Sequence, residues 1–311
     1  MRLLKLLFGA LCLAAALAAI GVAIICLMNP HRPQLYLIDI FSVPITSGVC
    51  LLAAVLWLVR QKGAAGIATL AAALLIASIW PQGHPVQGGA DPSRPAVRMM
   101  FANLLIRNTT PEKLLPWVET QNPDVVAVVE ANQHYRDQLV EGLKASRPYI
   151  ATRYDMVVAS RYPLSDQQNY PTGFALMTVK VKTPDGPLTL AVAHLTRPWP
   201  YTGAQDQPRQ FDRLAHTITP MMNERFVMVG DFNSSPCAVQ LQDLAKRTGL
   251  HITPAFRGTW PTFLPGILRI TIDNGLASRD LTLSRRHAGP FDGSDHRPIV
   301  FDIRPVRNDR P

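Results

Sequence analysis

The stretch VMVGDFNSSP, residues 227–236, is a short apolar strand that ends in a carboxylate and a carboxamide. The predicted strand stops at Gly230, so the side chains that follow lie at the edge of a sheet. Asp231 and Asn233 are two residues apart and point the same way on an extended backbone. The pair suits a site that handles a water molecule and a phosphate oxygen. Gly, Asp and Asn are equally typical of an ordinary turn, so the rest of the chain must decide.

The composition of the 311-residue chain indicates an anionic partner without identifying it. The formal net charge is +9, and residues after Lys62 hold 26 basic and 21 acidic side chains. This modest excess suits a phosphoester or an anionic lipid but is too small to indicate nucleic acid by itself. Only Cys237 of the four cysteines lies in the polar part of the chain, which excludes an internal disulfide or a cysteine metal site there.

Three long uncharged apolar runs lie within the first 80 residues. They are Leu6–Met28, Ile40–Val59 and Ala64–Trp80, with 23, 20 and 17 residues. A helix of this length crosses a hydrocarbon core of about 30 Å. A signal peptide would explain the basic start but not the length of the first run or the runs that follow. A buried bundle in a soluble protein would need polar faces that these runs lack. The sequence therefore predicts three transmembrane helices.

Basic residues in the short loops predict the orientation of these helices. Arg2 and Lys5 precede the first run, and Arg60 and Lys62 separate the second from the third. The loop between the first and second runs carries a single basic residue. Because basic loops stay in the cytoplasm, the chain after the third run is expected on the opposite side. This predicts a multi-pass protein of the cell inner membrane with a periplasmic, extracytoplasmic domain.

The composition changes twice after the third run. Residues 81–96 are rich in Pro and Gly and are expected to form an exposed linker. We thus predict a membrane anchor over residues 1–80, a linker over 81–96, a globular domain over 97–305 and a tail over 306–311. Within the globular domain, short apolar strands outnumber helices, and hairpins mix with crossovers. This pattern indicates an α/β fold of two packed sheets with helices outside.

Six places in this domain carry polar residues that hydrophobic patterning does not require. They are Asn103, Glu130, His194, the pair Asp231 and Asn233, Asp273, and the pair Asp295 and His296. A single such residue is usually a hydrogen-bonded structural residue. Six of them, nearly all at the carboxyl ends of predicted strands, favour a shared site, because ligand sites gather at strand ends.

In this order and spacing, the residues resemble the endonuclease/exonuclease/phosphatase superfamily, which has the DNase I-like fold. Gly-Asp-Phe-Asn at 230–233 and Ser-Asp-His-Arg-Pro at 294–298 are the most specific pieces. The resemblance implies a four-layer sandwich of two mixed β-sheets flanked by helices, here preceded by three transmembrane helices. It extends to bacterial membrane-anchored members of the superfamily. The chain departs from the family pattern at Leu105, where a second polar residue often follows the first Asn.

The resemblance implies cleavage of phosphodiester or phosphomonoester bonds with a divalent metal ion, Mg²⁺ or Mn²⁺. Glu130, Asn103 and Asp295 are then the expected metal ligands, since hard cations prefer oxygen donors. Such an ion acts as a Lewis acid on a phosphoryl oxygen.

The remaining residues receive catalytic roles from the same resemblance. Asp231 is expected to orient and deprotonate the attacking water, and Asn233 to hold a phosphate oxygen. His296 is expected to contact the phosphate, with Asp273 fixing its tautomer. His194 is expected to protonate the leaving oxygen.

The sequence thus predicts a membrane-tethered phosphoesterase with two partners, a phosphoester substrate and the lipid bilayer. A lipid-linked or small substrate is favoured, because tethering brings lipid phosphates to the site. A membrane-anchored endonuclease or exonuclease acting on nucleic acid is the main alternative, and a catalytically silent interaction module is an alternative of another class. No protein partner is inferred. Trp260 and the segment Arg197 to Trp199 are each expected either to line the cleft or to pack structurally.

Overall fold

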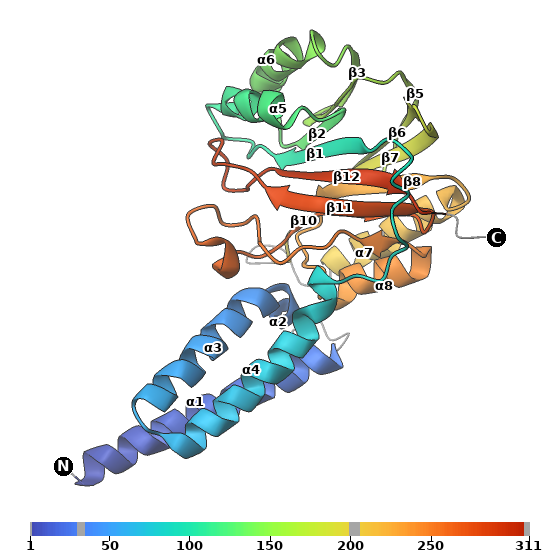
Figure 1. Ribbon diagram of the computed structural model, residues 1–311. Helices are drawn as coiled ribbons and strands as arrows, with labels where there is room; N and C mark the ends of the chain where they lie inside the picture. Colours follow the sequence, from blue (N-terminus) through green and yellow to red (C-terminus); the bar gives the residue numbers. More distant parts are fainter. Residues whose placement is uncertain (1, 30–34, 199–205, 308–311) are drawn as a thin grey trace.

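The computed structural model describes residues 2–29, 35–198 and 206–307. An N-terminal group of helices extends away from a β-rich domain (Figure 1). These helices are α1 (Arg2–Met28), α2 (Tyr36–Ile40), α3 (Ser42–Leu58) and α4 (Lys62–Gly83). Two of the described helices, α1 and α4, are long and apolar enough to cross a membrane. The second predicted run forms the shorter α3, 17 residues long, because the chain breaks at Phe41 and leaves the helical conformation at Arg60.

The anchor, which we define as residues 2–83, has small side chains inside and large apolar ones outside. Ala16, Ala65, Ala68 and Ala71 are fully buried where α1, α3 and α4 pack together. Leucines, isoleucines and tryptophans of the same helices face outward, with Leu58 exposed to 81%. This arrangement reverses the usual pattern of a soluble helical bundle, in which large apolar side chains form the core.

Two six-stranded sheets form the globular domain. The first has the order β11-β12-β1-β2-β4-β3, and the second has the order β5-β6-β7-β8-β10-β9. The strands of the first sheet are β1 (Val97–Asn103), β2 (Val125–Val129), β3 (Tyr149–Arg153), β4 (Met156–Ser160), β11 (Leu281–Ala288) and β12 (Ile299–Pro305). The strands of the second are β5 (Leu164–Asn169), β6 (Ala175–Thr183), β7 (Gly186–His194), β8 (Phe226–Asp231), β9 (His251–Ile252) and β10 (Asp273–Ala277). Both sheets are mixed, since β1 pairs with β2 and β7 pairs with β8 in parallel while the other pairs are antiparallel.

Helices cover the outer face of each sheet and complete a four-layer sandwich. The first sheet carries η1 (Pro111–Leu114), α5 (Leu115–Gln121) and α6 (Gln133–Lys144). The second carries α7 (Asp206–Ile218), η2 (Thr219–Met221) and α8 (Val239–Thr248). Between the sheets, Phe101, Val129, Val229 and Phe301 belong to one continuous apolar core. The predicted α/β sandwich of two mixed sheets flanked by helices is therefore confirmed.

The anchor is docked against the globular domain by direct hydrogen bonds. Gln82, near the end of α4, donates to the carbonyl of Ala255 at 2.5 Å, and the Ala255 amide donates back to the Gln82 carbonyl at 2.7 Å. Ser235 donates to the carbonyl of Asp39 in α2 at 2.8 Å. Beside these bonds, Ile40 packs in an apolar cluster with residues of the globular domain. The turn that follows β8 therefore rests on the anchor.

Residues 84–96 are largely exposed, as predicted, but they are not a free tether. Gln87 donates to the carbonyl of Leu283 at 2.9 Å and accepts from its amide at 3.0 Å. Ala90 forms a β-bridge with Val306 beyond the end of β12. Pro81–Gly83 continue α4 rather than starting the linker. The linker is therefore exposed but also attached to the globular domain, which satisfies several of its polar groups.

Gly230, next to the end of β8, has no room for a side chain. A Cβ there would lie 2.1 Å from the carbonyl oxygen of Ala193, its partner on β7. We expect Gly230→Ala to lower the free energy of unfolding by about 3 kcal/mol or more, because the main chain itself must move. Thermal melting of the purified protein measures this. Gly89→Ala is the matched control, since its added methyl group meets nothing within 4 Å, and equal melting temperatures for the two variants would contradict the prediction.

Candidate active site

The two sheets bring every predicted polar position to one edge of the sandwich. Asn103 ends β1, Glu130 follows β2, His194 ends β7 and Asp231 ends β8. Asp273 instead begins β10, and Asp295 and His296 precede β12. These last positions reach the same edge because β10 and β12 run antiparallel to β8 and β1. The prediction that nearly all lie at carboxyl ends therefore holds for four of the six strands.

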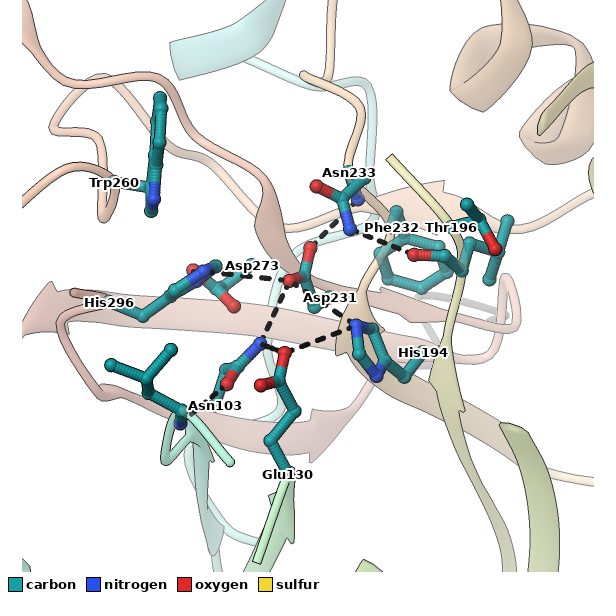
Figure 2. Close-up of polar contacts among 12 residues, drawn as sticks. Asn103, Glu130, His194, Thr196, Asp231, Phe232, Asn233, Trp260, Asp273 and His296 are labelled. Carbon is teal, nitrogen blue, oxygen red and sulfur yellow. Dashed lines mark hydrogen bonds and ion pairs between the residues drawn. The ribbon is translucent and has the colours of Figure 1, made fainter. Parts of the chain in front are cut away.

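Asp231 lies at the centre of the site, with the other side chains arranged around it (Figure 2). The side chain of Asn103 donates to its Oδ2 at 3.0 Å, and the amide of Asn233 donates to its Oδ1 at 2.8 Å. Nε2 of His296 lies 3.7 Å and Nε2 of His194 lies 3.9 Å from Oδ2. Asp231 is 1% exposed. Burial and the charge of Asp273 raise the pKa of Asp231 to about 6, although both histidines oppose that rise.

His296 is held by Asp273 on one face of the central carboxylate. Nδ1 of His296 lies 2.9 Å from Oδ2 of Asp273, and both side chains are buried. Burial would lower the pKa of His296, but Asp273 and Asp231 outweigh it and raise that pKa to about 10. With Nδ1 fixed, Nε2 of His296 is directed toward Asp231, as Figure 2 shows. The geometry matches the predicted orientation of this histidine by Asp273.

Glu130 and His194 form the other side of the site. Glu130 accepts from the side chain of Asn103 at 2.9 Å and from the amide of Ile106 at 2.9 Å. Nε2 of His194 lies 3.5 Å from Oε1 of Glu130. Burial would raise the pKa of Glu130, but His194 and the two hydrogen bonds outweigh it and lower that pKa. Glu130 is therefore held as a carboxylate that faces the histidine expected to protonate the leaving oxygen.

Asn233 does not extend from the strand as predicted. β8 ends at Asp231, and Asn233 adopts a left-handed conformation with φ of 46°. Its side-chain nitrogen donates to the carbonyl of Leu195 at 2.8 Å, which ties the turn to the end of β7. The expectation of two parallel side chains on an extended backbone is wrong, because Asn tolerates this turn conformation and its amide finds a local acceptor. Asn233 still lines the active-site pocket.

Trp260, whose role the sequence left open, forms a hydrogen bond with Asp295. The indole Nε1 of Trp260 donates to Oδ2 of Asp295 at 3.0 Å. The other oxygen, Oδ1, is buried without a hydrogen-bond partner among the described residues and lies 4.0 Å from Nε2 of His296. Trp260 thus lines the cleft and orients a predicted metal ligand. The sequence could not predict this contact, because Trp260 lies in a loop directly before Pro261, where no hydrophobic periodicity shows which way a side chain points.

A pocket of about 460 Å³ is lined by most of the predicted site residues, namely Glu130, His194, Asp231, Asn233, Asp295 and His296, while Asn103 and Asp273 contact these residues without lining it. Arg107, Arg197 and Ile106 are exposed side chains that contribute to its wall, while Trp199 lies outside the described residues. Leu105, the departure from the family pattern, contributes its backbone, since its amide donates to Oδ1 of Asn103 at 2.9 Å. The pocket therefore combines buried carboxylates with cations at its wall, which suits an anionic substrate that carries a reacting ester.

One set of side chains here has the spacing of a metal site. Among the described residues, Asp231, Asp273 and His296 have ligand atoms that all lie within 4.8 Å of one another. This set differs from the predicted Glu130, Asn103 and Asp295. Asp273 and His296 already bond to each other, whereas Oδ1 of Asp295 is an unpartnered buried oxygen in the pocket that Glu130 also lines. Glu130 and Asp295 thus offer carboxylate oxygens of the kind that a hard divalent cation prefers, whereas Asn103 turns its amide nitrogen to Glu130 and Asp231, and its Oδ1 accepts from the Leu105 amide.

A four-layer sandwich with buried carboxylates and an oriented histidine at one sheet edge defines a class of phosphoester-cleaving proteins. The family model described as "Endonuclease/Exonuclease/phosphatase family" matches residues 86–296. The chain belongs to this family, and it is accordingly a hydrolase that acts on ester bonds. No curated protein sequence matches the chain.

Solved structures with the same fold are distant in sequence. TDP2 from D. rerio, complexed with single-strand DNA product, is 16% identical with a TM-score of 0.57, over 68% of this chain and 99% of that one. A beta toxin variant from Staphylococcus aureus with bound magnesium ions is 13% identical with a TM-score of 0.54, over 67% and 99%. Sphingomyelinase C from Streptomyces griseocarneus is 15% identical with a TM-score of 0.51, over 67% and 99%. At these identities the likeness concerns the fold.

Proposed function

We propose that the protein is a membrane-anchored, divalent-metal-dependent phosphoesterase that acts on the extracytoplasmic side of the membrane. The observation that best supports this proposal is a direct contact between the anchor and the turn that follows β8 and Asp231. In this turn, Ser235 donates to the carbonyl of Asp39 in the anchor. The proposal keeps the predicted four parts but moves the end of the anchor from residue 80 to Gly83, where α4 ends, so that the linker covers 84–96, the catalytic domain 97–305 and the tail 306–311.

The inside-out packing of the anchor supports its placement in a bilayer as three crossings. Helices in a membrane pack through small residues and turn large apolar ones to the lipid, as α1, α3 and α4 do. At about 1.5 Å per residue, α3 falls near the lower limit for a span. The N-terminus of α1 and the turn between α3 and α4 lie at the end farthest from the catalytic domain (Figure 1). Their basic residues favour the cytoplasm for that end, and we assign the chain to a bacterial inner membrane with its catalytic domain on the periplasmic side.

The catalytic roles follow from the contacts of each side chain. Asp231 accepts two hydrogen bonds in the centre of the pocket and serves as the base that takes a proton from the attacking water. His296 places its Nε2 beside that carboxylate, where a phosphate oxygen would receive its proton or hydrogen bond. His194 stands 3.9 Å away on the opposite side and delivers a proton to the leaving oxygen. Asn233 fixes the turn and lines the pocket, where its carboxamide contacts the phosphate.

The metal ion of the proposal is Mg²⁺ or Mn²⁺, held by Glu130 and Asp295, with Asn103 bridging Glu130 to Asp231. When bound, it supplies a positive charge that polarises the phosphoryl group. The magnesium ions of the beta toxin variant support this choice by analogy of fold.

A phosphoester panel tests the proposed function directly. The full chain, reconstituted in bilayer discs, is offered a bis-p-nitrophenyl ester, a phospholipid and single- and double-stranded DNA, with Mg²⁺ and with chelator. We expect hydrolysis of a small or lipid phosphoester that stops on chelation and returns with Mg²⁺. Preferential cleavage of DNA, with steep salt dependence, would favour the nuclease alternative. Absence of any metal-dependent cleavage would favour a silent interaction module.

Trp260→Phe tests the orientation of Asp295. Phenylalanine keeps the ring but removes the donor that reaches Asp295 at 3.0 Å. We expect the Mg²⁺ concentration for half-maximal activity to rise about 10- to 100-fold, because groups that orient a metal ligand contribute this much to affinity. The rate at saturating Mg²⁺ should change little. Trp117→Phe is the control, since Trp117 packs edge-on against His287 outside the active-site pocket. An unchanged Mg²⁺ dependence in Trp260→Phe would contradict the assigned role.

A further inference from the structure

A second cavity, of about 660 Å³, lies where the catalytic domain meets the anchor. Its wall combines Gly83 at the end of α4, residues 254–258, residues 265–267 with Arg269, and the second half of β11. The segment 265–269 includes η3 (Gly266–Leu268), part of the orange loop between the sheets and α3 in Figure 1. The cavity shares no lining residue with the active-site pocket among the described residues. We call it the junction cavity.

Three arginines supply the charge of the junction cavity, namely Arg257, Arg269 and Arg286. Within residues 2–29, 35–198 and 206–307, no carboxylate oxygen lies within 4.0 Å of their guanidinium nitrogens. Arg269 donates instead to the carbonyls of Leu264 at 2.6 Å and Thr262 at 3.1 Å. Neutral acceptors thus hold the Arg269 guanidinium in place, and its charge is left without an anionic hydrogen-bond partner among the described residues.

Arg286 gives the clearest sign of a missing partner. Its terminal nitrogens donate to the carbonyls of Arg257 at 3.3 Å and Asp273 at 3.1 Å. Its Nε is buried and has no hydrogen-bond partner among the described residues. Burial lowers the pKa of Arg286 to about 10, with the charge of Asp273 opposing this. A buried cationic donor without an acceptor is costly, and a bound anion would remove that cost.

Contacts between the wall of the junction cavity and the anchor indicate where the cavity lies relative to the membrane surface. Ser47, in the second turn of α3, donates to the carbonyl of Ile267 at 3.1 Å. His84 stacks on Trp80 of α4 with ring centroids 4.0 Å apart and meets Phe256, a wall residue, edge-on at 5.7 Å. Exposed tryptophans at helix ends mark the headgroup region of a bilayer. The junction cavity therefore lies at the level of lipid headgroups if the anchor crosses the membrane.

Apolar side chains in and near the loop that carries η3 are also exposed, and one of them, Ile267, lines the junction cavity. Phe263 and Ile267, in the loop that bonds to α3, are exposed to 83% and 60%. Exposed large apolar residues next to cations match the two parts of a phospholipid, because its acyl chains are apolar and its phosphate is anionic. A soluble phosphate compound would use the arginines but would leave these apolar side chains in water.

We propose that the junction cavity binds the phosphate group of an anionic glycerophospholipid from the extracytoplasmic leaflet. Arg257, Arg269 and Arg286 contact the headgroup, while Phe263 and Ile267 lie among the acyl chains. This inference rests on the membrane placement in the proposed function but not on the catalytic reaction. The bound lipid is a structural ligand at a site separate from the catalytic pocket, and it holds the catalytic domain at a fixed height above the bilayer.

Native mass spectrometry of lipids retained by the full chain tests the proposal. The chain carries Asp231→Asn, so that no lipid is consumed, and is incubated in detergent with equal amounts of phosphatidylglycerol and phosphatidylcholine. We expect preferential retention of one phosphatidylglycerol. Arg257→Gln should lower this preference about tenfold, as for the loss of one charge-assisted contact. The Arg257 side chain makes no hydrogen bond in the described structure, so this variant should fold normally.

A matched control removes the same charge outside the junction cavity. Arg285→Gln changes the neighbour of Arg286 on β11, where the side chain is 69% exposed and pairs with Asp302. Equal retention of both lipids by the parent chain, or an equal loss in Arg257→Gln and Arg285→Gln, would overturn the proposal. Displacement of the lipid by an equal concentration of inorganic phosphate would assign the site to a soluble anion instead. Failure of the chain to enter bilayer discs would contradict the proposed membrane anchoring itself. A chain that enters the discs but retains no phosphatidylglycerol would contradict only the lipid site.

Discussion

The Asp231→Asn variant is expected to lose about 100- to 10,000-fold in kcat/KM for any phosphoester that the protein cleaves. Asparagine preserves the shape of the side chain but cannot take a proton from water. It also places an amide group where Asn103 and the Asn233 amide both donate, at 3.0 and 2.8 Å, so one donor meets another donor. Because both effects act on the reacting water, kcat should fall much more than KM rises. Steady-state kinetics with a chromogenic phosphodiester measures this.

The stability of this variant separates catalysis from folding. Burial raises the pKa of Asp231, so removing its charge offsets part of the cost of the donor-to-donor contact, and the melting temperature should fall only modestly. Asp302→Asn is the matched control, since Asp302 is another buried carboxylate and accepts from Arg98 at 2.8 Å. It should melt at a lower temperature but keep its activity when folded. An active Asp231→Asn variant, or one inactive only because it unfolds, would contradict the role of Asp231 as the base.

The catalytic edge could be predicted because strong signals coincide there. Apolar strands such as β2 and β8 read clearly as strands, and a polar residue directly after each is unneeded for packing. The sequence placed Asp295 and His296 just before the last strand, but it read Asp273 as a residue within a strand over 270–276, whereas Asp273 begins β10. The left-handed backbone conformation of Asn233 could not be predicted either, because asparagine is common both at the end of an extended strand and in a left-handed turn.

Two strands could not be predicted because their hydrophobic patterns are weak. β5 is almost entirely exposed, with the sequence LSDQQN, so no apolar alternation marks it. The second half of β11 alternates between exposed and half-buried side chains, and a bulge interrupts its pairing with β12. Strands at the edge of a sheet need less apolar surface than central strands, and these three-dimensional contexts override local propensity.

The docking of the anchor was unpredictable for a different reason. Gln82 reads as the start of a Pro- and Gly-rich linker, yet it is buried and bonds to the Ala255 backbone in both directions. Nothing in the sequence pairs residue 82 with residue 255, because hydrogen bonds to a backbone leave no trace in side-chain chemistry. The junction cavity depends on this docking, so its arginines could not be assigned to one site from the sequence.

Asp273→Asn is expected to reduce kcat about 100- to 10,000-fold while leaving KM nearly unchanged. Oδ2 of Asp273 lies 2.9 Å from Nδ1 of His296 and fixes the imidazole with Nε2 toward Asp231. An asparagine in its place either presents an amide to the imidazole N–H or turns that amide toward the buried, unpartnered position of Oδ1. In both cases the orientation or the charge that supports His296 is lost. Steady-state kinetics at saturating Mg²⁺ separates kcat from KM.

A double-mutant cycle decides whether Asp273 acts through His296. If it does, Asp273→Asn should cost nothing further in a His296→Ala background, since residues that act as a unit are not additive. A further loss would mean that Asp273 acts by another route, for example as a metal ligand together with Asp231. Asp292→Asn is the control, because that buried carboxylate accepts from the Ser294 amide at 3.2 Å and forms no hydrogen bond or ion pair with the imidazole of His296 in the described part of the chain. If Asp273→Asn causes no additional loss in the His296→Ala background, Asp273 is a positioning residue for His296. Glu130 and Asp295 then remain the proposed metal ligands.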